Sequence, residues 1–348
     1  MAEPHTLDYR STGVDLDAAE RVMEGLKSLV ASTRDENTLS APGQFGGLYA
    51  VPGDVSNPIL VSSTDGVGTK VKVAFESGRH GTVGQDLVNH CVDDILVQGA
   101  RPLFFLDYIG CGAMDESIVP EVVAGVAMGC KENGCALLGG ETAEMPEFYA
   151  KNEYDLAGFI VGIVERDRIL DGSRVRAGDV LIGLGSTGLH TNGYTLARKI
   201  VFESMGLSID DEFPESGRSV ADVLLDVHRS YLPVLSDALG AGRLRGLAHI
   251  TGGGIPGNLP RTLGSALGAV IDLTSWEVPD VFRILEEAGG VARGEMLRVF
   301  NMGVGMIAMV APEDVDVVLA SLGQADGSTD VQAFIIGEVE AGEGVRFA

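Results

Sequence analysis

The chain has 348 residues, of which 45% are hydrophobic, which is enough for a sizeable core and too many for an intrinsically disordered protein. Its 50 acidic residues outnumber 25 basic ones, and a formal net charge of −25 excludes a broad basic surface for nucleic acid. The first residues lack the apolar segment of a signal peptide, and no run of about 18 apolar residues could span a membrane. With only four cysteines, we expect a cytoplasmic protein with reduced thiols.

The first half of the chain alternates helical and strand patterns, as in an α/β or α+β domain. Apolar residues at helical spacing predict a helix over 16–30, and a Gly- and Pro-rich stretch over 40–53 predicts a loop. Apolar runs and periodicity then predict strands at 59–63, 71–75, 103–108, 135–138 and 156–164, with helices at 82–98 and 116–133.

A charged, turn-rich run over 165–179 is the best candidate for a domain boundary. We therefore expect two domains, 1–168 and 169–348. In the second, the patterns predict strands at 180–184, 268–273, 303–310 and 331–339, and helices at 194–203, 219–239 and 312–322.

Two glycine-rich segments, 183–188 and 252–257, fit the GxGxxG fingerprint of dinucleotide-binding proteins. Neither segment is followed by a recognisable second strand that carries the acidic residue needed to bind the ribose. Because the chain has 48 glycines, chance matches to this pattern are common. No Walker A sequence occurs, because the glycines of 66–70 stand too close together. These patterns alone do not predict a nucleotide site.

The segment TDGVGTKVK (64–72) carries more specific chemistry. Asp65 follows an apolar strand, and Gly66 and Gly68 let backbone amides approach an anion closely. If the chain then re-enters a strand, Lys70 and Lys72 lie on the same face. A carboxylate for Mg²⁺, bare amides and paired ammonium groups would suit a triphosphate. The alternative is a tight hairpin with solvated lysines.

Acidic side chains also gather on one face of the helix predicted over 82–98, where Asp86, His90, Asp93 and Asp94 are three or four residues apart. The ordinary interpretation is a solvated face, whereas neighbouring carboxylates are also what a divalent cation would bind. The segment GGET (139–142) repeats the combination of a strand end, bare backbone and a carboxylate. Together the three segments favour a metal–nucleotide site.

Longer segments resemble one known family, the phosphoribosylformylglycinamidine cyclo-ligases, or aminoimidazole ribonucleotide synthetases, of purine biosynthesis. The similarity runs from residue 9 to about residue 306 in the family's order. The segments that carry it are YRSTGVDLDA (9–18), STDGVGTKVK (63–72), GQDLVNHCVDDILVQGARPLFFLDY (84–108), GGETAEMP (139–146), DLAGFIVGIVE (155–165), GLHTNGYTLARKI (188–200), HITGGGIPGNLPR (249–261) and FNMGVGM (300–306).

The resemblance implies an ATP-dependent ring closure. ATP would activate the formyl oxygen of formylglycinamidine ribonucleotide, the amidine nitrogen would attack that carbon, and 5-aminoimidazole ribonucleotide, ADP and phosphate would form. It also implies two α/β domains and a homodimer whose N-terminal strands form a shared barrel. ATP and Mg²⁺ would bind mainly to the N-terminal domain. A monovalent cation is compatible with the resemblance, and neither nucleic acid nor a membrane is expected as a partner.

The family's site residues can be placed by their motifs in this sequence. The resemblance implies Mg²⁺ ligands at Asp65, Asp94 and Glu141. It implies nucleotide binding by Lys27, Asp65, Gly66, Gly68, Thr69, Lys70, Asp94, Gly139, Gly140 and Glu141, and catalytic roles for Lys70, His190 and Asn192. A histidine titrates near neutral pH, which suits proton transfer. The substrate phosphate would contact Thr251, Gly252, Gly253, Gly254 and Arg261.

The chain departs from the family pattern at a few positions. Asp93 stands where the family usually has asparagine, which leaves the metal stoichiometry and the role of Asp93 open, and Glu147 stands where a glycine is expected. Other interpretations are a selenophosphate synthetase-like or thiamine-monophosphate kinase-like enzyme of the same superfamily, or a hydrogenase-maturation relative. The first would carry a reactive cysteine or selenocysteine in an N-terminal glycine-rich loop, whereas the first cysteine here is Cys91. The second does not share the HTNGYT and HITGGG segments, and the third ends in a cysteine where this chain ends in alanine. A non-enzymatic acidic scaffold, with the glycine loops acting only as turns, is the alternative from a different class.

Overall fold

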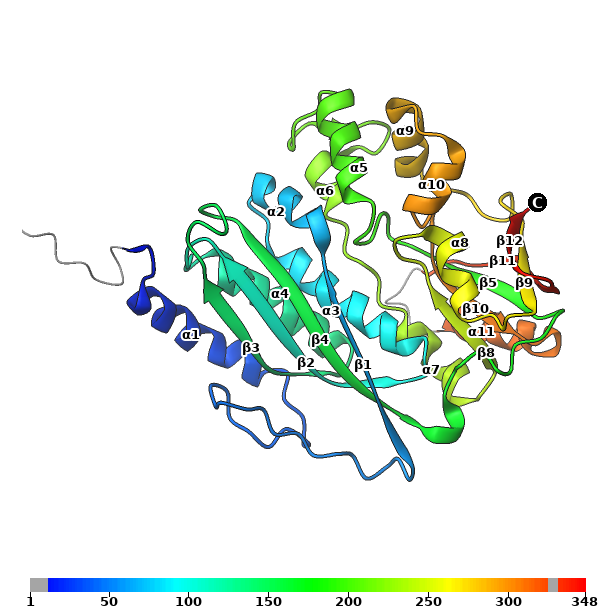
Figure 1. Cartoon of the computed structure of the whole chain (residues 1–348), viewed down its shortest axis with the longest axis horizontal. Helices are drawn as coiled ribbons and strands as arrows, with labels where there is room; N and C mark the ends of the chain where they lie inside the picture. The colour runs from blue at the N-terminus through cyan, green and yellow to red at the C-terminus, as the bar shows by residue number, and fades with distance from the viewer. Residues whose placement is uncertain (1–11, 325–330) are drawn as a thin grey trace, which may run out of the picture.

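A computed structural model describes residues 12–324 and 331–348 of the chain, so the first three residues of the 9–18 segment lie outside the described residues. Two β-sheets lie side by side, each backed by helices, and helix α3 (Gly81–Leu96) passes behind the first sheet towards the second (Figure 1). The N-terminal and C-terminal ends of the described chain lie on opposite sides of the molecule.

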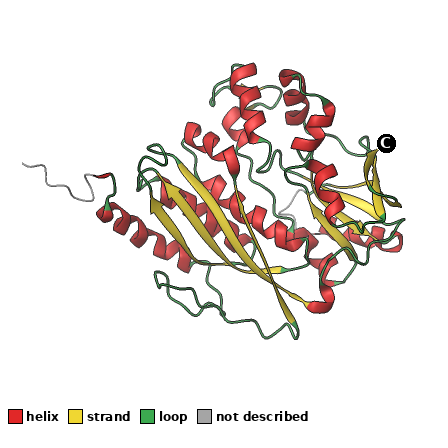
Figure 2. Ribbon diagram, viewed as in Figure 1, coloured by secondary structure: helices red, strands yellow, loops and turns green. Residues whose placement is uncertain are grey.

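The first sheet has the strand order β1-β4-β2-β3. Its members are β1 (Pro58–Gly66), β2 (Arg101–Cys111), β3 (Ala136–Glu144) and β4 (Tyr154–Glu165). Neighbours are antiparallel except β2 and β3, which are parallel and joined through helix α4 (Ile118–Glu132). As Figure 2 shows, helices cover the rear face of this sheet, while the face towards the viewer carries no helix.

Helix α1 (Leu16–Ala31) packs against α4 and the β3 edge. Asp15 caps it, because its side chain accepts hydrogen bonds from the backbone amides of Asp17 and Ala18. Val22 and Leu26 are buried, as the helical spacing of the apolar residues predicts. The helix predicted over 16–30 is therefore confirmed.

Helices α3 and α4 cross at glycines. A Cβ added to Gly125 would stand 1.8 Å from the carbonyl oxygen of Gly81, and one added to Gly84 would stand 2.1 Å from that of Val122. Because neither residue has a side chain, the two backbones approach within contact distance. This close approach fixes the position of α3 against α4, behind the sheet.

The second sheet has the order β12-β9-β11-β5-β10-β8, and only its β12–β9 pair is parallel. Its members are β5 (Val180–Gly185), β8 (Leu244–His249), β9 (Leu267–Ile271), β10 (Val304–Val310), β11 (Ala333–Ala341) and β12 (Gly344–Phe347). All seven residues of β10 are buried, and alternate residues enter two separate apolar clusters, one on each face of the sheet. A strand buried on both faces reads as a continuous apolar run, which explains why it is visible in the sequence.

The remaining elements surround these two sheets. The helices are α2 (Val71–Ser77), α5 (Tyr194–Arg198), α6 (Val220–Leu224), α7 (Leu232–Gly240), α8 (Gly254–Asn258), α9 (Asp280–Gly289), α10 (Arg293–Val299) and α11 (Val315–Gln324). A π-helical turn, Lys199–Ser204, continues α5, and the short strands β6 (Glu212–Phe213) and β7 (Arg218–Ser219) pair with each other. Among the described residues, none of the helices is both long and apolar enough to cross a membrane.

Two predictions about local structure were wrong, and some elements were not predicted at all. The strand predicted at 71–75 is helix α2, because Gly68, at a φ of +56°, turns the chain into a 3₁₀ turn that leads into the helix. The long helix predicted at 219–239 is broken into α6 and α7 by residues 225–231, whose backbone groups bind side chains of α3 instead. The sequence patterns did not predict β8, β12, α9 or α10.

The glycine crossing of α3 and α4 gives a stability test. Gly125→Ala should lower the free energy of unfolding by about 1–3 kcal/mol, because the added methyl group meets a backbone oxygen that cannot rotate away. Gly25→Ala in α1 is the matched control, since no described atom lies within 4 Å of its added Cβ. It should be neutral or stabilise by up to about 1 kcal/mol. Urea denaturation measures both, and equal effects of the two substitutions would contradict the crossing.

Candidate active site

The polar face of α3 is buried against the segment between α6 and α7. Asp86 Oδ1 accepts a hydrogen bond of 2.6 Å from the backbone amide of His228, and Asp93 Oδ1 accepts one of 2.9 Å from that of Tyr231. Asn89 donates to the carbonyl oxygen of His228 at 2.7 Å. The acidic face of this helix is therefore not a solvated surface, because it holds a segment from the other half of the chain.

Lys70 enters the same interface. Its ammonium lies 2.8 Å from Asp86 Oδ2, with both side chains fully buried, and donates to the carbonyl oxygens of His190 and Asp226 at 3.0 and 2.6 Å. Burial lowers the pKa of Lys70 and raises that of Asp86, while their mutual attraction opposes both shifts.

The predicted pairing of Lys70 with Lys72 on one strand face is wrong. Lys72 lies on α2, and its ammonium is 2.5 Å from Glu153. Lys70 contacts buried protein groups in this conformation, so its predicted contact with a phosphoryl group would require the interface around it to open.

Four of the six histidines of the chain meet where α3, the 228–231 segment and the end of β8 come together. The rings of His190 and His228 are stacked with centroids 4.1 Å apart, and His90 and His249 each lie 5.1 Å from His228. All four side chains are almost fully buried. We call this group the histidine cluster.

Two aspartates from the first half of the chain make hydrogen bonds to histidines of the cluster. Asp65 Oδ2 lies 2.7 Å from Nε2 of His90, and Asp94 Oδ1 lies 3.0 Å from Nδ1 of His249, while Ser63 donates to Asp94 at 2.9 Å. Burial opposes ionisation of both carboxyl groups, but the hydrogen bonds from the histidines outweigh it, so the pKa values of both aspartates are lowered. Their side chains remain 43% and 26% exposed, which leaves carboxylate oxygens accessible to a cation.

His190 is buried, and its imidazole makes a hydrogen bond to the backbone. Its Nε2 accepts a hydrogen bond of 3.3 Å from the amide of Thr187, and its backbone φ is +61°. Burial, with the nearby His249 and Lys70, holds its pKa well below the ordinary value. The expectation that His190 transfers a proton near neutral pH stays a prediction. Gly305 makes room for it, because a Cβ there would stand 2.5 Å from the His190 ring.

The loops predicted to bind phosphate approach one another from the two halves of the chain. Thr69 and Thr195 share a hydrogen bond of 2.9 Å, and a Cβ on Gly252 would stand 3.2 Å from Asn192 Oδ1. The loop at 251–254 is braced by Asn258, whose amide donates to the carbonyls of Thr251, Gly252 and Gly254. Gly252 and Gly253 are exposed, as is Arg261 in the following turn.

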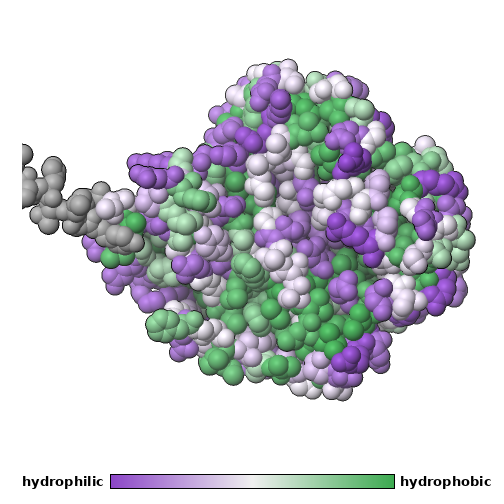
Figure 3. All heavy atoms as spheres, in the orientation of Figure 1, coloured by the Kyte–Doolittle hydropathy of each residue, from purple (hydrophilic) through white to green (hydrophobic). Residues whose placement is uncertain are grey.

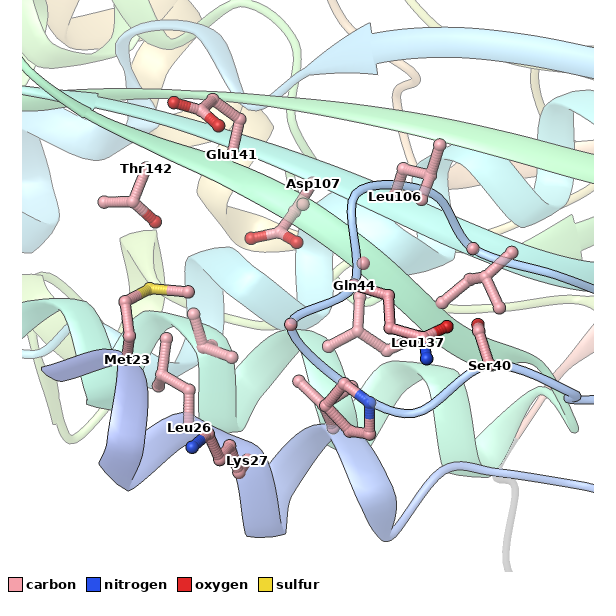
Figure 4. Close-up of a pocket in the computed structure, with 18 of the residues that line it drawn as sticks. Met23, Leu26, Lys27, Ser40, Gln44, Leu106, Asp107, Leu137, Glu141 and Thr142 are labelled. Atoms are coloured by element: carbon pink, nitrogen blue, oxygen red, sulfur yellow. The ribbon is translucent and has the colours of Figure 1, made fainter. Parts of the chain in front are cut away.

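A second site lies at the β3 edge of the first sheet (Figure 4). It is a cavity of about 540 Å³ between α1, the loop at 40–47 and the end of β3. Its wall includes Lys27, which pairs with Glu24, together with Gly139, Gly140 and Glu141. These four residues were predicted from the sequence to bind nucleotide, and the fold brings them to one cavity.

Asp107 is a buried carboxyl group in the wall of this cavity. Burial raises its pKa to about 7. A Cβ on Gly140 would stand 2.0 Å from Asp107 Oδ1, so the glycine leaves the space that the carboxyl group occupies.

The three predicted Mg²⁺ ligands do not converge within one chain. Strand pairing places Asp65, Gly158, Asp107 and Gly140 in one row across the sheet, whereas Glu141 belongs to the next row. Adjacent rows face opposite sides, and in Figure 4 Glu141 lies across the strand from Asp107. β1 and β3 are also separated by β4 and β2, a span of about 14 Å at 4.8 Å per strand.

Comparison with known proteins identifies the family. The N-terminal domain of AIR synthase related proteins matches residues 49–164, and the C-terminal domain matches residues 176–348. A protein of Trichlorobacter lovleyi named phosphoribosylformylglycinamidine cyclo-ligase is 49% identical over 342 residues, covering 98% of this chain and 97% of that protein. One of Myxococcus xanthus with the same name is 51% identical, covering 97% and 96%. The chain belongs to the phosphoribosylformylglycinamidine cyclo-ligase family. The resemblance found in the sequence is thereby confirmed.

The fold of this cyclo-ligase family member also occurs in solved structures at low identity. A thiamine-monophosphate kinase from Stenotrophomonas maltophilia has a TM-score of 0.69 at 18% identity, covering 93% of this chain and 95% of that one. Hydrogenase maturation protein HypE, solved in complex with ATP, has a TM-score of 0.65 at 21% identity, covering 93% and 86%. At these identities the likeness shows the fold alone, and it confirms the predicted mixed α/β class.

Two members of the histidine cluster were not singled out from the sequence. His228 lies in the middle of a stretch that was predicted as one helix, and His249 was seen only as part of a glycine-rich segment. Histidine frequency offered a usable signal, since the whole chain has six, and His190, His228 and His249 all fall in the second half.

The Lys70–Asp86 pair predicts a large stability effect. Lys70→Met should lower the free energy of unfolding by about 3–5 kcal/mol, because it leaves a buried carboxylate without its cation. Adding Asp86→Asn to this variant should recover part of the loss. Lys131→Met, at an exposed position of α4, should change stability by less than about 0.5 kcal/mol. Chemical denaturation measures all three, and a stable single variant would contradict the buried pair.

Asp107 predicts a pH dependence. Its pKa of about 7 in the folded state exceeds the value near 3.9 of an unfolded chain, so the folded protein binds the proton more tightly. Its contribution to the free energy of unfolding is fully present below about pH 4 and is lost as the pH rises to about 7. The total loss is at most about 4 kcal/mol. The free energy of unfolding of the Asp107→Asn variant should not decrease over this pH range. Denaturation at pH 4 to 8 measures it, with the exposed Asp237→Asn as control, and parallel profiles for the parent and Asp107→Asn would refute the shift.

Proposed function

We propose that this protein catalyses the ATP-dependent ring closure of formylglycinamidine ribonucleotide to 5-aminoimidazole ribonucleotide, with release of ADP and phosphate. The observation that carries the proposal is the identity of about 50% over nearly the full length with proteins named phosphoribosylformylglycinamidine cyclo-ligase. In this reaction the formyl oxygen is phosphorylated by ATP, the amidine nitrogen attacks the activated carbon, and phosphate leaves.

We assign the nucleotide to the first half of the chain, which we propose as a domain over 1–168. The cavity beside α1 has an apolar wall that suits a base, and Lys27 at its rim suits an anionic group. Its glycines, Gly139 and Gly140, allow close approach of a ligand to the backbone. HypE, which shares the fold, was solved with ATP.

We assign Mg²⁺ to Asp65 and Asp94, whose oxygen ligands suit a hard cation. Both carboxyl groups have lowered pKa values and are ionised at neutral pH. His90 and His249 hold them in place through the hydrogen bonds described above. Bound there, Mg²⁺ would neutralise charge on the phosphates of ATP.

We assign the ribonucleotide to the junction between the two halves, with a second domain over 169–348 completing the cleft. The exposed backbone at Gly252 and Gly253 would bind the 5′-phosphate, and Arg261 would add a positive charge nearby. Asn192 lies beside this loop and would contact the substrate. His190, buried behind Asn192, would orient the loop.

We also propose a cytoplasmic homodimer formed through the outer face of the first sheet. Figure 3 shows hydrophobic residues gathered over the lower part of this face. Leu60 on β1 and Phe159 on β4 are 60% and 44% exposed there, which is high for large apolar side chains on a sheet. Glu141 projects from the same face, where a second protomer would cover it.

The reaction gives the decisive experiment. Incubation with Mg-ATP should yield ADP only when formylglycinamidine ribonucleotide is present, in amounts equal to the aminoimidazole product. Thiamine monophosphate should not replace that substrate. Phosphate release that ignores the ribonucleotide would refute the proposed function, and phosphorylation of thiamine monophosphate would favour a kinase instead.

Within that assay, Asp94→Asn tests the metal assignment. We expect kcat to fall at least about 100-fold, because a charged ligand at the site of phosphoryl transfer is lost. Asp272→Asn, an exposed turn residue after β9, is the control and should retain activity. Near-normal turnover of Asp94→Asn, with the dimer intact by light scattering, would remove Asp94 from the metal site.

A further inference from the structure

Three buried side chains of types that bind metal ions meet at the centre of the histidine cluster. They are Asp93 of α3, His228 between α6 and α7, and His249 at the end of β8. The Nε2 atoms of His228 and His249 are 3.2 Å apart, and Nε2 of His228 is 3.4 Å from Oδ2 of Asp93. All three ligand atoms lie within 4.8 Å of one another.

Two of the three separations match the edges of a coordination tetrahedron, and the third is at most 4.8 Å. Two ligand atoms bound to Zn²⁺ at about 2.0–2.1 Å with a tetrahedral angle stand about 3.3 Å apart. The two measured distances, 3.2 and 3.4 Å, lie on either side of this value. A small cation can therefore be held by all three residues once the ligand atoms of His249 and Asp93 approach to the same separation.

Asp93 carries an incompletely satisfied oxygen at this point. Its Oδ1 accepts the amide hydrogen of Tyr231, but Oδ2 is buried and accepts no well-aligned hydrogen bond from the described residues, its ion-pair neighbour being Nε2 of His228 at 3.4 Å. A buried carboxylate oxygen without a well-aligned hydrogen bond is costly, because it has lost its hydration and gained little in return. A bound cation would supply the missing interaction.

His249 is already oriented as a ligand, whereas His228 hydrogen-bonds to it through Nε2 and would shift its hydrogen to Nδ1 on binding a metal. Asp94 accepts the Nδ1 hydrogen of His249, which leaves the lone pair of Nε2 directed to the centre of the three residues. His228 Nδ1 lies 3.3 Å from Thr191 Oγ1 on its outer side. Carboxylate or hydroxyl partners behind a histidine are the usual way in which a metal-binding imidazole is held.

We propose that Asp93, His228 and His249 form a binding site for a transition-metal cation of the Zn²⁺ type. Two imidazole nitrogens and one carboxylate oxygen suit Zn²⁺ or Co²⁺ and do not suit Mg²⁺, which prefers oxygen ligands in octahedral arrangement. The site adjoins the carboxylates proposed to bind Mg²⁺, because His249 hydrogen-bonds to Asp94 through Nδ1. It joins α3 of the first half of the chain to two segments of the second, so the bound ion would strengthen their association.

Metal titration of the full-length protein tests the site. After treatment with a chelator, Co²⁺ should bind at one equivalent per chain and give the intense visible absorption of tetrahedral cobalt. Zn²⁺ should displace it, and a large excess of Mg²⁺ should not. Asp93→Asn, which keeps the shape of the side chain, should weaken Co²⁺ binding at least about 100-fold. His80→Gln, a buried histidine bonded to Tyr154 outside the cluster, should leave binding unchanged.

Several outcomes would overturn the proposal. They are Co²⁺ binding by Asp93→Asn as tight as that of the parent, an octahedral cobalt spectrum, or displacement by equimolar Mg²⁺. X-ray absorption of the Zn²⁺-loaded parent requires no variant and should show two imidazole ligands, so it decides the question if Asp93→Asn does not fold. None of these measurements requires the ligase reaction, and the result is therefore independent of the proposed function.

Discussion

Helix α3 joins the two halves of the molecule through side chains that would ordinarily stay in water. Asp86 and Asp93 bind the backbone of the 228–231 segment, and Lys70 neutralises Asp86 from the adjacent turn. Because the amides of His228 and Tyr231 are used in this way, the chain cannot continue as a helix there. The interruption is what brings His228 into contact with the other histidines.

The glycines around this interface have a related purpose. Gly84 and Gly125 let α3 lie close to α4, which fixes the depth of the helix behind the sheet. Gly305 leaves space on β10 for both the Tyr231 hydroxyl group and the His190 ring. A strand buried on both faces can accept such large neighbours only where it lacks a side chain. The glycines thus leave the space that the side chains of the polar interface occupy.

The large negative charge is compatible with anionic ligands because the charges near the proposed site are mostly paired. Asp65 and Asp94 bind histidines, and Asp86 binds Lys70, so these carboxylates do not add simply to the surface field. Most of the acidic excess lies elsewhere on the exposed surface, where it favours solubility. The phosphate-binding role that we propose for the 251–254 loop relies on backbone amides, which do not depend on net charge.

Much of the fold could be predicted from local pattern. The helix at 16–30 has an amphipathic period and a capping residue, and the strand at 303–310 is a continuous apolar run, so both signals are contained within each segment. Prediction failed where distant residues decide the structure. VKVAF (71–75) alternates like a strand, yet the turn at Gly68 and its buried contacts make it a helix. The family motifs located most site residues, but neither the burial of Lys70 nor the separation of Glu141 from Asp65 can be read from spacing along the chain.

The sequence separation of the contacts at α3 has a consequence for how the protein acquires its site. The bond between Asp86 and the amide of His228 spans 142 positions, and that between Asp93 and Tyr231 spans 138. During synthesis α3 emerges long before its partner segment, so its carboxylates are hydrated until the second half arrives. Closing so long a loop and stripping that water both slow the docking step. The histidine cluster therefore cannot form before the 228–231 segment has docked on α3.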